Sequence, residues 1–292
     1  MIVFLDDRFL PADEATVSVF DRGFLYGDAL FETIRCHAGR PFLWAEHLQR
    51  LHRGAECLSL PVPVAAATLH ATALELLRRN ALTDAVLRLT LSRGVGPRGY
   101  SPRGATRPTL VLAAFPAPAP DTHPPRPWHL RTSGVRLPAG DPLAAFKTAN
   151  KLLHVLARAE VEASTATAAD ADAADEALLL NTQGHVAETS AANVFWWNGE
   201  TVSTPALTTG ALAGVTRAWT MRALRALGWP CREVLAGPEA LGTASGVFLT
   251  FSGQGLVEVG RLDGQALSID ARFARIRDAY RIALRRAGSA SD

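Results

Sequence analysis

The sequence predicts a mixed α/β protein with two domains. The first observation is size, because 292 residues with 48% hydrophobic side chains are enough for two ordinary cores. The second is a mixture of short apolar runs, typical of strands, and longer amphipathic runs, typical of helices. The third is a run of six prolines within residues 116–127, which indicates a linker. We therefore expect a smaller N-terminal α/β domain at residues 1–115 and a larger C-terminal domain at residues 128–292.

The N-terminal part is predicted to contain strands and two helices. Apolar residues recur at helical spacing in residues 44–60 and again in residues 64–80. A glycine-rich and charged segment, residues 21–35, indicates a shaped loop that leads into a strand. The other strands are expected at residues 2–5, 9–10, 16–19, 85–92 and 109–115.

A glycine- and arginine-rich loop is expected at residues 92–102. It contains a formal G-x-G-x-x-G pattern at Gly94, Gly96 and Gly99. A dinucleotide site needs a helix that opens at this pattern, whereas here Pro97 falls inside it and no helix follows. The loop instead suits an anionic ligand or a subunit contact.

The C-terminal part is predicted to alternate short strands and turns. A helix is expected to begin near Ala149 and to end in an Ala- and Asp-rich mobile surface loop at residues 160–175. Small residues before Val215 lead directly into a helix, so its first N–H groups form a candidate anion site, with an ordinary helix cap as the alternative. The remaining elements are strands at residues 177–181, 185–188, 193–197, 201–203, 247–250 and 256–259, and helices at residues 215–227 and 271–286.

Composition excludes several function classes. A formal charge of +2 provides no strong basic field, so nucleic acid is not an expected partner. The three cysteines are widely spaced and show neither a zinc pattern nor a disulfide framework, which favours a reducing, cytoplasmic setting without a bound metal. No signal peptide or bilayer-spanning apolar run is present, so no membrane association is expected.

Lysine is rare in this chain. Of the 30 lysine and arginine residues, only Lys147 and Lys151 are lysines. An amine can lose its proton near neutral pH and attack a carbonyl, whereas a guanidinium stays protonated. This stretch is therefore a candidate site for a lysine that forms a Schiff base. The alternative is a pair of surface lysines four residues apart on a helix.

Six stretches, taken together, resemble the fold type IV (class IV) pyridoxal-phosphate aminotransferases and lyases. Their order along the chain matches the family order, and the resemblance extends from Asp21 to about Gly264. It implies a C-terminal domain with a barrel-like β-sheet core and flanking helices, and a homodimer. The stretches are residues 21–33, 47–51, 147–150, 188–193, 214–217 and 248–250.

The resemblance assigns roles to individual residues. It implies that Lys147 is the catalytic residue, which binds pyridoxal 5'-phosphate covalently and moves a substrate proton. Arg50 would bind the cofactor phosphate, and Glu188 would lie against the pyridine nitrogen, where a carboxylate keeps that nitrogen protonated. The other residues implied in cofactor binding are Asn193, Val215, Thr216 and Ser252. Those implied in binding an anionic substrate are Phe31, Arg98 and Tyr100, while Arg93 would brace the loop.

Within the family, residues 93–100 and 191–196 are similar to aminodeoxychorismate lyases. This implies conversion of 4-amino-4-deoxychorismate to 4-aminobenzoate and pyruvate, in the folate pathway. Lys151 stands where branched-chain aminotransferases carry tyrosine, which argues against that branch. Pro97 and Phe251 depart from the lyase pattern, so a transaminase for D-amino or other small amino acids remains the alternative. A relative without activity is a third hypothesis.

Overall fold

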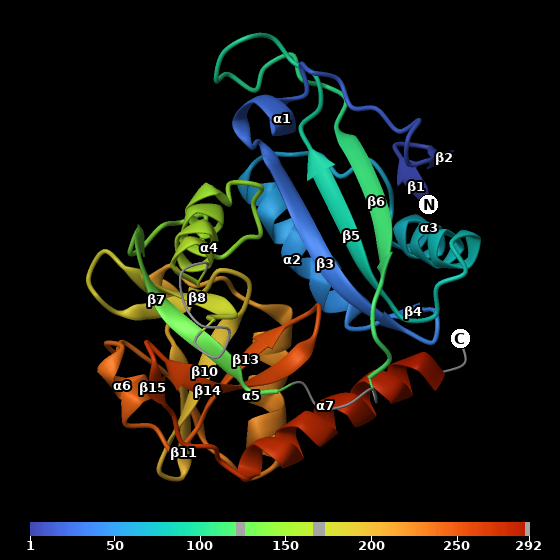
Figure 1. Ribbon diagram of the computed structural model, residues 1–292. Helices are drawn as coiled ribbons and strands as arrows, with labels where there is room; N and C mark the ends of the chain where they lie inside the picture. The colour runs from blue at the N-terminus through green and yellow to red at the C-terminus, as the bar shows by residue number, and fades with distance from the viewer. Residues whose placement is uncertain (121–125, 166–172, 290–292) are drawn as a thin grey trace. The chain divides into compact units, whose positions relative to one another are not determined.

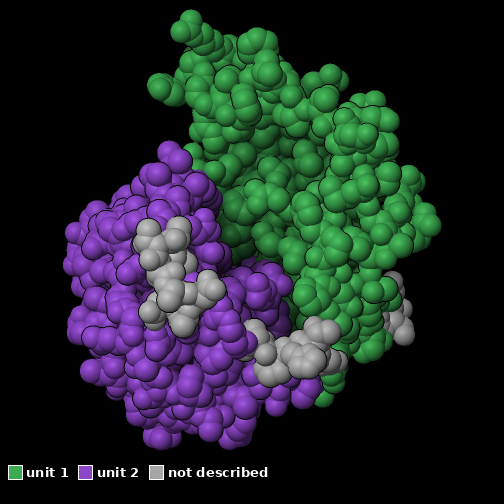
Figure 2. Space-filling model, viewed as in Figure 1, with its two compact units in different colours: residues 1–122, 146–150, 283–292 green, residues 123–145, 151–282 purple. Residues whose placement is uncertain are grey.

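The computed structural model describes residues 1–120, 126–165 and 173–289, which fall into two compact units (Figure 2). Unit 1 comprises Met1–Thr122, Phe146–Asn150 and Ala283–Asp292, and unit 2 comprises His123–Ala145 and Lys151–Ile282. The segment that contains Lys147 therefore belongs to the same unit as the N-terminal strands. The expected division at residues 116–127 instead assigns Lys147 to the C-terminal domain, and residues 121–125 of that linker lie outside the described residues. The bounds of the two domains stay a prediction.

Unit 1 is built on a six-stranded antiparallel sheet with the order β2-β1-β6-β5-β3-β4. Its core is formed by the leucine-rich faces of two helices and the sheet. Helix α2 packs against β3, and helix α3 packs against β1 and β6 (Figure 1). The elements are β1 (Ile2–Leu5), β2 (Arg8–Pro11), α1 (Arg22–Tyr26), β3 (Ala29–His37), β4 (Arg40–Pro41), α2 (Trp44–Cys57), α3 (Ala66–Arg79), β5 (Ala85–Ser92) and β6 (Thr109–Pro116).

Unit 2 is built on a nine-stranded mixed sheet with the order β12-β11-β10-β13-β14-β7-β8-β9, to which β15 adds at β14. The sheet curls, because β9 at one end of this order contacts β10 and β11. This agrees with the expected barrel-like core. Its strands are β7 (Trp128–Leu137), β8 (Glu176–Asn181), β9 (Val186–Thr189), β10 (Asn193–Asn198), β11 (Thr201–Pro205), β12 (Cys231–Val234), β13 (Val247–Phe251), β14 (Gly255–Leu262) and β15 (Gln265–Ala266).

Helices flank the curled sheet of unit 2. Helix α4 packs on β7 and β8, where Ala157 and Val161 join a buried apolar cluster. Helix α5 packs on β12 and β13. The helical elements are α4 (Leu152–Thr165), η2 (Leu207–Thr209), α5 (Val215–Ala226), α6 (Glu239–Gly242) and α7 (Arg272–Ser289), the last of which extends into unit 1 from Ala283 onward.

Three expectations about secondary structure were wrong. Residues 16–19 do not form a strand, because this exposed segment pairs with no neighbouring strand in the described chain. Residues 22–26 are helical rather than looped, since Asp21 caps this short helix at its Gly23 N–H and Gly27 ends it with a left-handed backbone. The helix expected from Ala149 begins at Leu152. The mobile loop expected at residues 160–175 falls partly outside the described residues, at 166–172.

Among the described residues, no helix is both long and apolar enough to cross a bilayer. The expected cytoplasmic location stays a prediction.

Candidate functional site

The segment around Lys147 is an extended stretch held along β3. The Phe31 N–H donates to the Lys147 carbonyl at 2.8 Å, and the Ala149 N–H donates to the Ala29 carbonyl at 2.9 Å. Between them, Thr148 lies opposite Leu30 in an isolated bridge. The two lysines therefore do not share a helix face. Instead, the backbone from Lys147 to Ala149 is held against β3 of the sheet.

The side chains of Lys147 and Arg88 both lie near the ring of Phe31. The Lys147 Nζ is 4.6 Å from the ring centroid, and the Arg88 guanidinium carbon is 4.0 Å from it. The negative face of an aromatic ring attracts such cations. Phe31 is buried, whereas Arg88 is exposed on β5. Arg88 was missed in the sequence, because it occupies an outward position in an alternating strand and no spacing relates it to Phe31 or Lys147.

Arg50 belongs to a buried charged cluster with Glu32 and His47. Its Nε and Nη2 donate to the two carboxylate oxygens of Glu32 at 2.8 and 2.6 Å, and His47 Nδ1 donates to Glu32 Oε2 at 2.7 Å. Burial alone would raise the pKa of Glu32, but the Arg50 guanidinium and the hydrogen bonds from His47 and Arg50 lower it to about 2. The sequence suggested Arg50 as a phosphate ligand but gave no sign of Glu32 as its partner.

In unit 2, Glu188 and Asn193 form the centre of a second polar cluster. Glu188 lies in β9 and is buried, and its Oε2 accepts from the Leu212 N–H at 2.9 Å and from Asn193 Nδ2 at 3.4 Å. The Asn193 Nδ2 also donates to the Leu212 carbonyl at 2.9 Å. On its other oxygen, Glu188 is 3.0 Å from His154 Nε2. The sequence did not indicate either Leu212 or His154.

The N-terminus of α5 lies next to this cluster. Gly214 occupies the N-cap, no side chain caps the first N–H groups, and Val215 and Thr216 are buried. A Cβ on Gly214 would lie 2.0 Å from Asn193 Oδ1, so a larger residue here would displace the Asn193 amide. Thr216 Oγ1 is 3.3 Å from Ser252 Oγ. A twelve-residue helix with uncapped N–H groups and two hydroxyls at its start is suited to a phosphate.

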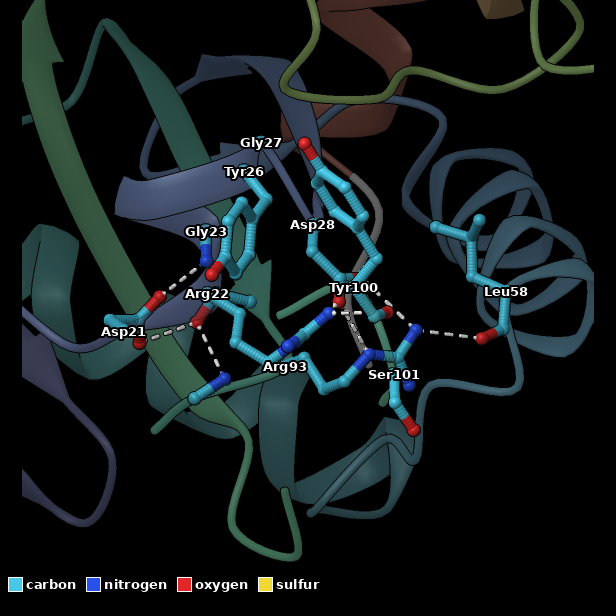
Figure 3. Close-up of polar contacts among 12 residues, drawn as sticks. Asp21, Arg22, Gly23, Tyr26, Gly27, Asp28, Leu58, Arg93, Tyr100 and Ser101 are labelled. Atoms are coloured by element: carbon cyan, nitrogen blue, oxygen red, sulfur yellow. Dashed lines mark hydrogen bonds and ion pairs between the residues drawn. The ribbon is translucent and has the colours of Figure 1, made fainter. Parts of the chain in front are cut away.

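Two buried arginines fix the loop that follows β5 (Figure 3). Arg22 donates to Asp28 at 3.0 Å and to the carbonyls of Gly99 and Tyr100 at 2.8 and 3.0 Å. Arg93 donates to both oxygens of Asp28 at 2.7 and 3.0 Å, and to the Leu58 carbonyl at 2.8 Å. Arg93 thus braces the loop, as the sequence suggested. Asp21 does not pair with Arg22, because its carboxylate accepts from the hydroxyls of Ser92 and Thr109 instead.

The two residues expected to bind substrate from this loop point outward. Arg98 is exposed, and Tyr100 is 89% exposed. Gly94 shapes the start of the loop, since its φ is +77° and a Cβ there would lie 1.8 Å from the Arg107 carbonyl oxygen. The backbone of the loop is therefore held at Arg93 and again at Gly99 and Tyr100, while the side chains of Arg98 and Tyr100 stay exposed.

The structure thus groups the expected site residues within each unit. Phe31 and Lys147 are in contact in unit 1, where Arg50 is buried beside Glu32, the residue after Phe31. Glu188 and Asn193 are in contact in unit 2, where Val215, Thr216 and Ser252 lie at the α5 N-terminus. Among the described residues, no group of three or more His, Cys, Asp or Glu side chains could hold a metal ion.

Comparison with known proteins identifies the family of this chain. The amino-transferase class IV model matches residues 29–262. A protein of Methanocaldococcus jannaschii, provisionally named a branched-chain-amino-acid aminotransferase, is 34% identical over 268 residues, which are 92% of this chain and 90% of that one. An aminodeoxychorismate lyase of Vibrio harveyi is 34% identical over 73% of this chain and 75% of its own. A D-alanine aminotransferase of Bacillus licheniformis is 26% identical over 93% of this chain and 92% of its own.

Solved structures show the same two kinds of enzyme. A branched-chain aminotransferase of Thermoproteus uzoniensis matches with a TM-score of 0.86 at 27% identity, covering 97% of this chain and 95% of that one. Another branched-chain amino acid aminotransferase, solved with pyridoxamine 5'-phosphate, has the same TM-score of 0.86 and the same 27% identity. A protein of Legionella pneumophila, provisionally named a 4-amino-4-deoxychorismate lyase, matches with a TM-score of 0.82 at 26% identity, covering 94% and 97%.

Proposed function

This chain belongs to the amino-transferase class IV family and is a pyridoxal-phosphate-dependent enzyme, and we propose that it is an aminodeoxychorismate lyase. It would convert 4-amino-4-deoxychorismate to 4-aminobenzoate and pyruvate. The observation that carries this choice within the family is the loop at residues 93–100. Its sequence resembles that of the lyases, and its backbone is held by Arg22 and Arg93 so that Arg98 stays accessible.

The cofactor phosphate needs positive charge and N–H donors, and the chain offers both. Within unit 2, we assign the phosphate to the first N–H groups of α5, at Val215 and Thr216, together with the Ser252 hydroxyl. For Arg50, in unit 1, the same role rests on the family resemblance alone. Glu188 is assigned to the pyridine nitrogen. When bound, the cofactor supplies an electron sink for the charge that develops at the reacting carbon. The uncapped N–H groups suit the phosphate, and the buried Glu188 carboxylate suits a protonated ring nitrogen.

Lys147 performs the proton transfer in this proposal. Its backbone is anchored on β3, so the amine is delivered from a fixed point, and Nζ removes the proton from C4 of the substrate. Loss of this proton and of the enolpyruvyl group leaves an aromatic ring, which makes the elimination favourable. Arg88, beside the same Phe31 ring, adds a positive charge near this site. That charge suits a substrate with two carboxylates.

Arg98 is assigned to one substrate carboxylate. Its side chain is exposed at the tip of a braced loop, as is that of Tyr100. In this family such a loop commonly reaches into the site of another subunit, so we infer a homodimer in which Arg98 and Tyr100 serve the partner.

An aminotransferase is the second candidate. It is favoured by the near-complete coverage of the aminotransferase relatives and by Pro97 and Phe251, which depart from the lyase pattern. In that reaction Lys147 would return the proton and leave the cofactor in its amine form.

One paired assay separates the two. The purified holoenzyme is incubated with 4-amino-4-deoxychorismate, and 4-aminobenzoate is quantified. In parallel it is mixed with D-alanine, L-leucine or L-glutamate, and the aldehyde absorbance of the cofactor is followed. We expect 4-aminobenzoate to form catalytically. Complete loss of the aldehyde band with an amino acid, turnover on a 2-oxo acid and no 4-aminobenzoate would exclude the lyase.

A further inference from the structure

His154 is a half-buried histidine that the proposed reaction leaves without a role. It is the third residue of α4, and its Nε2 lies 3.0 Å from Glu188 Oε1. The side chains of His154 and Glu188 are only 14% and 7% exposed. The other two N–H groups on this carboxylate, from Leu212 and Asn193, both reach Oε2. His154 therefore provides the contact to the opposite oxygen.

The contact defines which nitrogen of His154 carries hydrogen. An ionised carboxylate accepts hydrogen bonds and cannot donate them, so Nε2 must be the donor. The other nitrogen, Nδ1, is buried and has no hydrogen-bond partner in the described part of the chain. A proton on Nδ1 would be a buried donor without an acceptor, which is costly. These contacts therefore favour a hydrogen on Nε2 rather than on Nδ1.

Donors on both oxygens fix a carboxylate more fully than donors on one. Two donors at Oε2 leave the carboxylate plane able to tilt about that oxygen, whereas a third donor at Oε1 restrains the tilt. The donor is itself well placed, because α4 packs on β7 and β8 through Ala157 and Val161. The backbone that carries His154 is thus set by a buried apolar contact rather than by a loop.

We infer that His154 is a positioning residue, which holds the Glu188 carboxylate in the orientation that faces the pyridine nitrogen of the cofactor. This inference rests on the role proposed above for Glu188. His154 does not contact reacting atoms in this scheme. It acts only through the hydrogen bond from Nε2 to Glu188.

The test uses two amides that differ in reach. A glutamine side chain places its N–H near the position of histidine Nε2, whereas asparagine reaches only as far as Nδ1. His154→Gln should therefore keep the bond to Glu188, and His154→Asn should lose it. The matched control is His129→Gln on β7, a histidine whose backbone N–H bonds Asp175. Three quantities are measured: the dissociation constant of pyridoxal phosphate, the ring-nitrogen shift of ¹⁵N-labelled cofactor, and the tautomer of His154 in cofactor-free protein by ¹⁵N NMR.

We expect the Nε2–H tautomer of His154 in the parent protein. His154→Gln and His129→Gln should resemble the parent in both cofactor measurements. His154→Asn should bind the cofactor about tenfold more weakly, as for the loss of one hydrogen bond to a charged group. Its ring-nitrogen shift should move toward that of unprotonated pyridine. An Nδ1–H tautomer would overturn the inference. So would equal behaviour of the Gln and Asn variants, whether both resemble the parent or both are impaired.

Glu188→Gln separates this inference from the proposed function. If that variant shifts the ring-nitrogen signal while the two His154 variants remain equal to each other, only the role of His154 is wrong. If Glu188→Gln leaves the signal unchanged, Glu188 does not contact the pyridine nitrogen, and both assignments fall.

Discussion

Arg50 and Glu32 form a two-point ion pair in which the two side chains are 4% and 1% exposed. Removing one partner of such a pair is costly, because the charge of the other partner stays buried without compensation. Glu32→Gln should therefore lower the free energy of unfolding by about 3–5 kcal/mol, measured by urea unfolding at pH 7. The matched control is Glu75→Gln, which removes a surface carboxylate from Arg78 and Arg79 and should have a much smaller effect. Equal losses in the two variants would contradict the prediction.

The same pair predicts a pH dependence. The pKa of Glu32 falls from its ordinary value of 4.5 to about 2 on folding. A lowered pKa stabilises the folded state above the unfolded pKa, and this contribution is lost as the pH falls through the folded pKa. The stability difference between the parent and Glu32→Gln should hence be constant above about pH 5 and shrink toward pH 2. A difference that grows on acidification would show that Glu32 is not the group that titrates.

Covalent labelling should identify Lys147. The chain has only two lysines, so reduction of the holoenzyme with borohydride followed by peptide mapping leaves one competing side-chain amine. We expect the cofactor on Lys147, no label in Lys147→Arg, and an unchanged label in Lys151→Arg. Labelling at Lys151, or labelled Lys147→Arg protein, would refute the assignment.

Gly214 should tolerate no side chain. Gly214→Ala places a Cβ 2.0 Å from Asn193 Oδ1, so the Asn193 amide must move away from Glu188 and Leu212. We expect a loss of roughly 1–3 kcal/mol in stability, typical of overpacking, together with weaker cofactor binding by equilibrium dialysis. Gly242→Ala is the control, since nothing lies within 4 Å of a Cβ there. A Gly214→Ala protein with parental stability and affinity would exclude a tight contact at the α5 N-terminus.

Arg93 should protect the loop after β5 from proteolysis. Arg93→Gln removes the donors to Asp28 and Leu58, so the loop should open more often and trypsin should cleave after Arg98 several times faster. Arg103→Gln, an exposed change in the same loop, should leave the rate at Arg98 unchanged. Cleavage at this bond is followed by mass spectrometry, and an equal rate in Arg93→Gln and the parent would show that other contacts hold the loop.

Local sequence patterns were enough to predict much of the secondary structure. The strand expected at residues 85–92 matches β5 at both ends, because its apolar alternation is undisturbed. In contrast, β7 was missed, since it begins directly after the prolines and carries polar residues and a register shift between Thr132 and Arg136. Residues 16–19 alternate as a strand should, but alternation cannot supply a pairing partner.

Only part of the candidate site could be predicted from the sequence. Family motifs pointed to Lys147, Arg50 and Glu188, and their roles stay predictions. The groups that hold these residues were not found, because Glu32 and His154 reach Arg50 and Glu188 across 18 and 34 positions of the chain. Contacts at such separations depend on strand pairing and helix packing, which no local spacing reveals.

The two buried arginines that hold the loop, Arg22 and Arg93, share the single carboxylate of Asp28, which offsets one of their two charges. In the described chain Arg98, Arg103 and Arg107 form no such ion pair. The outward electrostatic potential of this region is therefore dominated by three exposed cations. Such a field accelerates the encounter with a doubly charged anion and weakens as ionic strength rises. The enzyme should for that reason capture its substrate most rapidly in dilute buffer.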